Sequence, residues 1–171
     1  MPPTASPSAP QPVTLEQKMM LLGEATLLLL QSPRHRGYAL HQLDSYVLTP
    51  LRLGQFQIYR SRRGPVGFVA WAFLEPETAR AYAAGDHELE PADWRAGDEL
   101  WFIEFIAPAG HAATIVRDLR RRLFPDAQAR SLRRYVDGRA PRIVHWWGAT
   151  AAGDRPRRRS PADPSPRGAT D

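Results

Sequence analysis

The first strong hydrophobic pattern in the chain has the spacing of an amphipathic helix. Apolar side chains recur at intervals of three and four residues, at Leu15, Met19, Leu22, Ala25 and Leu29, which places them on one helix face. Thr14 and Gln17 have the spacing of a capping box, and Pro33 is a helix breaker. The sequence therefore predicts a first helix over residues 15–31.

Runs of β-branched and aromatic residues predict five strands, over residues 55–60, 66–74, 100–107, 130–136 and 142–147. Turn residues 61–65 join the first two strands as a hairpin, and Asp137-Gly138 joins the last two. Three further helical segments are predicted, a short one near 38–45 and others over 77–84 and 111–124. This order predicts an α+β fold, with helices packed on a mixed, mostly antiparallel sheet.

The two ends of the chain differ in composition from the rest. Residues 1–13 carry no charge and are rich in Pro, Ser and Ala, whereas residues 151–171 are rich in Arg and Pro. Neither segment has enough apolar residues to fold, so both are expected to be disordered. One folded domain is expected over residues 14–150.

The charge and the cysteine content exclude several classes of site. Of the net charge of +5, two units lie in the tail, so the excess on the folded part is mild and no nucleic-acid partner is expected. Cysteine is absent, and the histidines have no metal-binding spacing. No apolar segment is long enough to span a bilayer, so a cytoplasmic protein is expected. A homodimer is compatible with the sequence.

Two residues stand out as candidate chemistry, His35 and Glu104. His35 follows the end of the first helix, and Glu104 lies inside an apolar strand. A buried carboxylate needs a cation or a hydrogen-bond donor as partner, and a histidine can be both. The simpler interpretations are that His35 is a solvated cap beside arginines, and that Glu104 pairs with an arginine.

Three short motifs follow one another along the chain. They are S-P-x-H-R over residues 32–36, D-W-x-x-G-D over 93–98 and W-F-I-[acid]-x-I-A-P-x-G over 101–110. Together they resemble the toxin-activating lysine acyltransferases, bacterial enzymes that acylate RTX cytolysin protoxins. The similarity covers about residues 14–150, and three motifs in one order are more specific than any of them alone.

The resemblance implies a fold similar to the Gcn5-related acetyltransferases. It also implies an activity, the transfer of a fatty acyl group from acyl carrier protein to internal lysines of an RTX protoxin. By the matching motif positions, His35 and Glu104 would form the catalytic pair, and Ser32 would support them. The family residue at position 104 is usually aspartate, so the glutamate here places its carboxylate roughly one bond length further out, and misplacement by ~1 Å can cost ~10²-fold in rate.

The chemistry required for acylation of a lysine fits this pair. A lysine amine has a pKa of about 10.4 and must lose a proton before it attacks a thioester, and an imidazole with a pKa of about 6.5 is suited to accept that proton. His35 would be this base, and Glu104 would orient the ring and stabilise the imidazolium. A covalent acyl-histidine intermediate is the alternative mechanism.

The resemblance also suggests where the acyl donor binds. In the acetyltransferase architecture the backbone after the central strand meets the pantetheine arm, which corresponds here to Ala107, Ala109, Gly110 and His111. No Gly-rich pyrophosphate loop occurs, which argues for a carrier protein and against coenzyme A. No bound cofactor is expected beyond the phosphopantetheine thioester of that carrier. Arginines of the 111–124 helix are candidates to dock the acidic carrier, namely Arg117, Arg120 and Arg121.

Two other functions remain open at this point. One is a small-molecule acetyltransferase of the same fold that uses acetyl-CoA. The other is a non-catalytic basic module that binds nucleic acid through its Arg-rich helix and tail, with strongly salt-dependent affinity.

Overall fold

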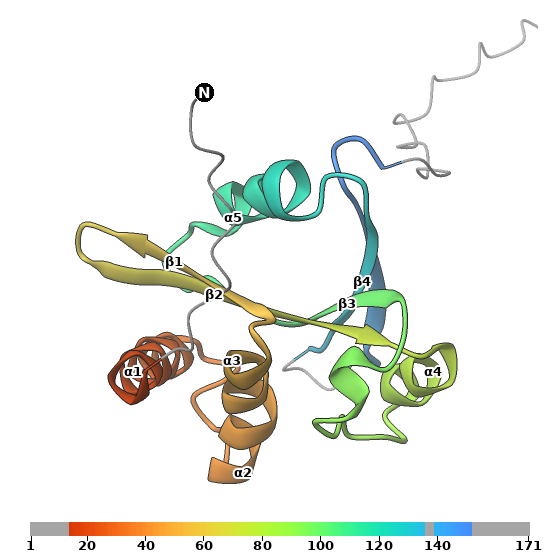
Figure 1. Ribbon diagram of the computed structural model, residues 1–171, viewed down its shortest axis with the longest axis horizontal. Helices are drawn as coiled ribbons and strands as arrows, with labels where there is room; N and C mark the ends of the chain where they lie inside the picture. Colours follow the sequence, from red (N-terminus) through yellow and green to blue (C-terminus); the bar gives the residue numbers. More distant parts are fainter. Residues whose placement is uncertain (1–13, 136–138, 152–171) are drawn as a thin grey trace, which may run out of the picture.

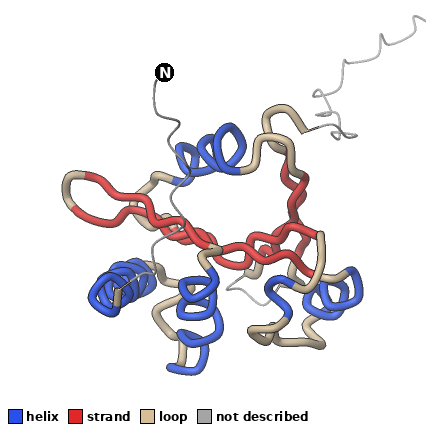
Figure 2. Tube along the Cα trace, viewed as in Figure 1, coloured by secondary structure: helices blue, strands red, loops and turns tan. Residues whose placement is uncertain are grey.

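The computed structural model describes residues 14–135 and 139–151. Over these residues one five-stranded sheet lies between two layers of helices (Figures 1 and 2). The predicted end segments, residues 1–13 and 152–171, and the predicted Asp137-Gly138 turn lie outside the described residues. Ala151, the first residue of the predicted tail, is described and is buried.

The sheet has its strands in the order of the sequence. They are β1 (Phe56–Ser61), β2 (Gly64–Leu74), β3 (Glu99–Ile106), β4 (Gln128–Arg133) and β5 (Arg142–Trp147). Neighbouring strands are antiparallel except β3 and β4, which are parallel. The predicted mixed, mostly antiparallel sheet is therefore confirmed, although β4 begins two residues and ends three residues earlier than the predicted segment 130–136.

The described helices are α1 (Leu15–Gln31), α2 (Leu40–Leu43), α3 (Thr49–Leu53), α4 (Pro76–Ala84) and α5 (Ala112–Asp118). Helix α5 covers one face of the sheet, and α1, α2, α3 and α4 cover the other (Figure 1). The first helix has the predicted bounds, and its capping box forms: Thr14 and Gln17 exchange side-chain to backbone hydrogen bonds. It ends at Gln31, and the N–H of its C-cap residue Ser32 donates to the carbonyl of Leu29.

The second helical region is longer than predicted. The segment expected near 38–45 begins at Leu40 and continues through a π-helical turn over Asp44–Leu48 into α3. In this turn the Thr49 N–H donates to the carbonyl of Asp44, five residues back. This wider hydrogen-bond spacing comes just before Pro50, which has no N–H to donate. The helical region therefore continues through a proline, a residue that normally ends a helix. A second π-helical turn, Leu119–Leu123, ends the α5 region before Pro125.

Each face of the sheet supports its own hydrophobic core. On the face towards α1, buried residues of β2 and β3 pack against Leu28 and Leu29 of α1; they include Phe68, Ala70, Ala72 and Trp101. On the opposite face Val69, Leu100 and Phe102 pack against Ile115 and Leu119 of the α5 region. This alternation along β2 and β3 explains why both strands are apolar almost throughout.

Two glycines allow close approach between elements. A Cβ on Gly67 of β2 would lie 2.3 Å from Cδ1 of Ile115, so glycine here lets α5 pack directly on the sheet. A Cβ on Gly97 would lie 2.3 Å from the backbone oxygen of Leu74. The D-W-x-x-G-D segment can therefore pack its backbone against the end of β2, with Trp94 fully buried.

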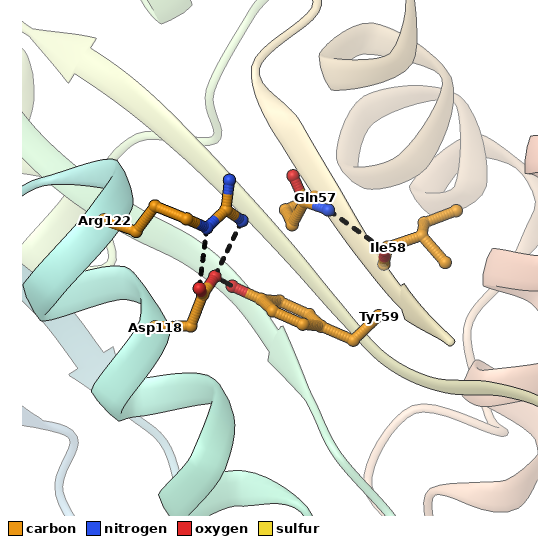
Figure 3. A network of polar contacts seen from close by, with 5 residues as sticks. All are labelled: Gln57, Ile58, Tyr59, Asp118 and Arg122. Carbon is orange, nitrogen blue, oxygen red and sulfur yellow. Dashed lines mark hydrogen bonds and ion pairs between the residues drawn. The ribbon is translucent and has the colours of Figure 1, made fainter. Parts of the chain in front are cut away.

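A buried glutamine connects α3, β2 and the D-W-x-x-G-D segment. The Gln55 amide donates to the backbone oxygens of Trp71 and Trp94, at 3.2 and 2.9 Å, and its oxygen accepts from Arg95 Nε at 3.0 Å. Its side chain is buried. By contrast, the Gln57 amide donates only to the adjacent carbonyl of Ile58 (Figure 3).

The Gln55→Leu variant should be destabilised by about 2 kcal/mol or more, because a side chain of similar size leaves two carbonyls without their donor, at about 1 to 3 kcal/mol each. Urea unfolding followed by circular dichroism measures this loss. Gln57→Leu is the matched control and should change stability by less than about 0.5 kcal/mol. Equal losses in the two variants would contradict the assigned role of Gln55.

Candidate active site

A β-bulge places Glu104 on the face of the sheet that α1 to α4 cover. Ala70 of β2 lies opposite Glu104 and Trp71 lies opposite Phe102, so Ile103 is an extra residue in β3. Ile103 packs in the same core as Trp101. With strict alternation the residue after Ile103 would face α5; the bulge turns Glu104 to the face of α1 instead.

His35 reaches the same face from the turn that follows α1. The backbone N–H groups of His35 and Arg36 both donate to the carbonyl of Ser32 at 3.0 Å, which closes the turn after Pro33. This turn directs the imidazole inwards, and the residue is only 3% exposed. His35 is therefore a buried side chain and not the solvated cap of the simpler interpretation.

The structure brings together the three predicted catalytic residues. Ser32 Oγ lies 2.6 Å from His35 Nδ1, and His35 Nε2 lies 3.1 Å from Glu104 Oε2. The second contact has an ion-pair distance without the direction of a hydrogen bond, and neither atom has a hydrogen-bond partner within the described residues. Such contacts commonly tighten when substrate binds.

A tyrosine that was not predicted from the sequence completes the cluster. The Tyr38 hydroxyl donates to Glu104 Oε1 at 2.7 Å, and the Tyr38 ring lies edge-on to the His35 ring with centroids 5.3 Å apart. Burial, followed by the charge of Glu104, raises the pKa of Tyr38 well above its usual range. The phenol therefore stays protonated and donates. Its position three residues after His35 was the available signal in the sequence.

A cavity of about 420 Å³ leads to Glu104 on the face of the sheet that α1 to α4 cover. Tyrosine, arginine and acidic side chains line it, among them Tyr46, Tyr82, Glu88 and Arg134. Burial raises the pKa of Tyr82 to about 12, and burial together with the charge of Glu88 raises the pKa of Tyr46. The cavity is therefore a polar, aromatic space in which Tyr46 and Tyr82 are neutral at physiological pH.

The predicted donor-binding residues lie beyond the end of β3. Parallel pairing of β3 with β4 covers only Leu100–Phe102, so within the described residues the strands part before β3 reaches Glu104. Ala107, Ala109 and Gly110 form the loop that follows, where Gly110 has a φ of +80°, and His111 precedes α5. None of the four lines the 420 Å³ cavity, so the structure places them apart from it.

The predicted docking arginines lie on the α5 region and differ in their contacts. A depression of about 410 Å³ is lined by Arg117, Arg120 and Arg121. Arg120 also donates through Nε to the carbonyl of Trp147 at 2.7 Å, which ties this helix to β5. Arg117 and Arg121 have no such structural bond among the contacts of the described residues.

A clamp holds the α5 region against β1 (Figure 3). Asp118 accepts hydrogen bonds from Arg122 Nε at 2.7 Å and from the Tyr59 hydroxyl at 2.8 Å. The Arg122 guanidinium, with the Tyr59 hydroxyl, holds the pKa of Asp118 below its usual range. Arg122 is thus paired within its own helix.

Across residues 14–135 and 139–151, no three His, Asp or Glu side chains come together as a metal site would require. Among the helices of the same residues, none combines the length and apolar character needed to cross a bilayer.

Comparison with known proteins identifies the family. The model of the RTX toxin acyltransferase family matches residues 14–148. The lysine-acyltransferase RtxC of Vibrio cholerae is 35% identical over 145 residues, which cover 81% of this chain and 95% of the relative. The protein-lysine palmitoyltransferase CyaC of Bordetella bronchiseptica is 34% identical, with 83% and 78% covered. The RTX-I toxin-activating lysine-acyltransferase ApxIC of Actinobacillus pleuropneumoniae is 33% identical, with 75% and 74% covered.

The α+β fold and a buried histidine–carboxylate pair beside a cavity define an enzyme-like site. With the family match over nearly all of the described residues, the chain belongs to the RTX toxin acyltransferase family. The resemblance of the three sequence motifs is therefore confirmed.

The clamp makes a pH-dependent contribution to stability. Because the pKa of Asp118 is lower in the folded state, its stabilisation is present above the unfolded value of about 3.9 and is lost as the pH falls through the folded value. Asp118→Asn should therefore be less stable than wild type at pH 7, and the gap should narrow on acidification below about pH 4. Thermal unfolding of both proteins across this range measures the gap, and a constant gap would contradict the assignment.

Proposed function

We propose that this protein transfers a fatty acyl group from acyl carrier protein to internal lysines of an RTX protoxin, with His35 as the base and Glu104 as its partner. The observation that carries the proposal is the buried Ser32–His35–Glu104 arrangement in a member of this family. Use of a carrier protein as donor implies that the reaction takes place in the cytoplasm.

The first step is removal of a proton from the acceptor lysine. In the tautomer that directs Nε2–H towards Glu104, His35 Nδ1 carries the lone pair and accepts a hydrogen bond from Ser32. A proton that reaches Nδ1 creates an imidazolium. The Nε2 atom of this imidazolium, which also carries a proton, lies 3.1 Å from Glu104 Oε2. The carboxylate stabilises this cation. Because His35 is buried and Ser32, which precedes the cavity-lining Pro33, is only partly buried, the Ser32 hydroxyl relays the proton to the ring.

The second step is acyl transfer. The lysine nitrogen attacks the thioester carbonyl carbon, the new C–N bond forms, and the C–S bond breaks. The thiolate of the carrier's pantetheine arm leaves and takes the proton back from the His35 imidazolium, which gives the free thiol and the neutral imidazole. An acyl-histidine intermediate would require Nδ1 itself to attack the carbonyl carbon. The 2.6 Å contact with Ser32 occupies that nitrogen, which favours the role of a base.

The two substrates approach from different parts of the fold. The lysine enters through the 420 Å³ cavity, where the tyrosines and Glu88 suit an amine on an alkyl chain. The pantetheine arm lies where β3 and β4 part, against the backbone of Ala107, Ala109, Gly110 and His111. The carrier docks on Arg117 and Arg121, and Arg120 holds the helix that bears them.

His35→Ala should lower the turnover number for acylation by roughly 10² to 10⁴-fold, because the base is lost. A suitable assay loads acyl carrier protein with palmitate, offers unacylated RTX-I toxin of A. pleuropneumoniae as acceptor, and counts acylated lysines by mass spectrometry. His145→Ala is the control, since His145 is an exposed histidine of β5 whose ring is tilted against that of Trp147, with centroids 5.9 Å apart. Near wild-type turnover of His35→Ala would exclude it as the base.

The donor should be acyl carrier protein, with the matching acyl-CoA used far less well. Charge reversal of Arg117 and Arg121 to Glu should raise KM for the carrier about tenfold or more with little change in kcat, and added salt should act in the same direction. Reversal of Arg62 and Arg63, two exposed arginines of the β1–β2 hairpin, is the matched control and should leave KM unchanged.

Efficient transfer from acetyl-CoA to a small amine, insensitive to both pairs of substitutions, would favour the alternative of a general acetyltransferase. Salt-dependent DNA binding without acyl transfer would favour the basic module.

A further inference from the structure

We propose that Tyr38 is a positioning residue for the acyl transfer, which fixes the long side chain of Glu104 so that one carboxylate oxygen faces His35. This inference rests on the proposed function of the His35–Glu104 pair. It concerns a residue outside the three predicted catalytic positions.

The two oxygens of Glu104 have separate partners. Oε1 accepts a hydrogen bond of 2.7 Å from the Tyr38 hydroxyl, and Oε2 lies 3.1 Å from His35 Nε2. Because the carboxylate is attached to its side chain at one end and held by the Tyr38 hydroxyl at Oε1, its rotation is restricted and Oε2 stays directed at the imidazole. Glu104 is 3% exposed, so its oxygens depend mainly on these two protein partners.

Tyr38 is well placed to hold Glu104 because it belongs to the same turn as His35. The Tyr38 N–H donates to the carbonyl of His35 at 3.0 Å, and the two rings are in edge contact. The Tyr38 ring also packs on Tyr46 at 6.0 Å. The donor that holds the carboxylate and the base that needs it therefore form one local unit, and their separation does not depend on distant parts of the chain.

A glutamate at this position needs such a second contact more than an aspartate does. Glutamate has one more rotatable bond than aspartate, and its carboxylate sits roughly one bond length further from the backbone. Errors of ~1 Å in a reacting group can cost ~10²-fold in rate. The Tyr38 hydrogen bond removes the additional freedom. The chain thus combines a longer acid with a donor that fixes its far end.

Tyr38→Phe removes only the hydroxyl oxygen and is the direct test. Turnover of palmitoyl-loaded acyl carrier protein with unacylated RTX-I toxin should fall roughly 10 to 10²-fold, with KM for the carrier within about twofold of wild type. Tyr59→Phe is the matched control, because it also removes a tyrosine hydroxyl that donates to a carboxylate, Asp118, on the opposite face of the sheet (Figure 3). Its kcat at saturating carrier should equal that of wild type, because Tyr59 contacts the α5 region and not the His35–Glu104 pair.

The effect of Tyr38→Phe on turnover, measured again in a Glu104→Gln protein, distinguishes a positioning role of Tyr38 from a purely structural one. If Tyr38 acts through the carboxylate, Tyr38→Phe should cause no more than about a twofold further loss once the charge is gone. The same fold-loss in both backgrounds would overturn the proposal, since a structural role is independent of that charge.

Glu104→Asp tests the proposal without altering Tyr38. The shorter side chain cannot contact Tyr38 and His35 together, so turnover should fall about tenfold or more. An aspartate variant as fast as wild type would show that the second contact is unnecessary and would overturn the inference. Inactivity of the wild-type protein with this donor and acceptor would instead count against the proposed function, so the two failures are distinguishable.

Discussion

Burial of the Glu104 carboxylate inside an apolar strand is the constraint around which the rest of the site is organised. A charge removed from water is costly unless donors or cations replace the solvent. Here an imidazole and a phenol do so, and both come from the turn after α1. That turn must therefore close tightly, and α1 must end where it does. The capping box at one end of α1 and the Ser32–Arg36 turn at the other set the position of these two partners relative to the sheet.

Local irregularities in regular elements create the site. The extra residue in β3 turns Glu104 towards α1, and the π-helical turn at Asp44–Leu48 carries the second helical region past Pro50. The short parallel pairing of β3 and β4 opens the sheet just beyond Phe102. Bulges and π-helical turns often occur at functional sites, because they redirect single side chains without disturbing the surrounding layers.

The spacing of apolar residues and the positions of helix breakers and turn residues predicted the strands, the bounds of α1 and the general architecture. These features depend on local sequence, such as Pro33 after the first helix. The pairing of His35 with Glu104 could be anticipated because a buried carboxylate requires a partner. Three features could not be predicted. The bulge at Ile103 depends on the register with β2, which is a long-range property. The role of Tyr38 depends on a contact across 66 positions of sequence. His35 is buried although it lies between two arginines, Arg34 and Arg36, and such charged neighbours in the sequence indicate an exposed residue.

The sheet also acts as a partition between the two partners of the proposed reaction. The cavity that ends at Glu104 lies on the face covered by α1 to α4, whereas the arginine-lined depression lies on the α5 region of the other face. A carrier and a protoxin bound in these places could occupy the protein together and meet only where the acceptor lysine reaches the thioester. Recognition of one could then diverge while recognition of the other stays unchanged, so a single scaffold could serve new protoxins and keep the same carrier.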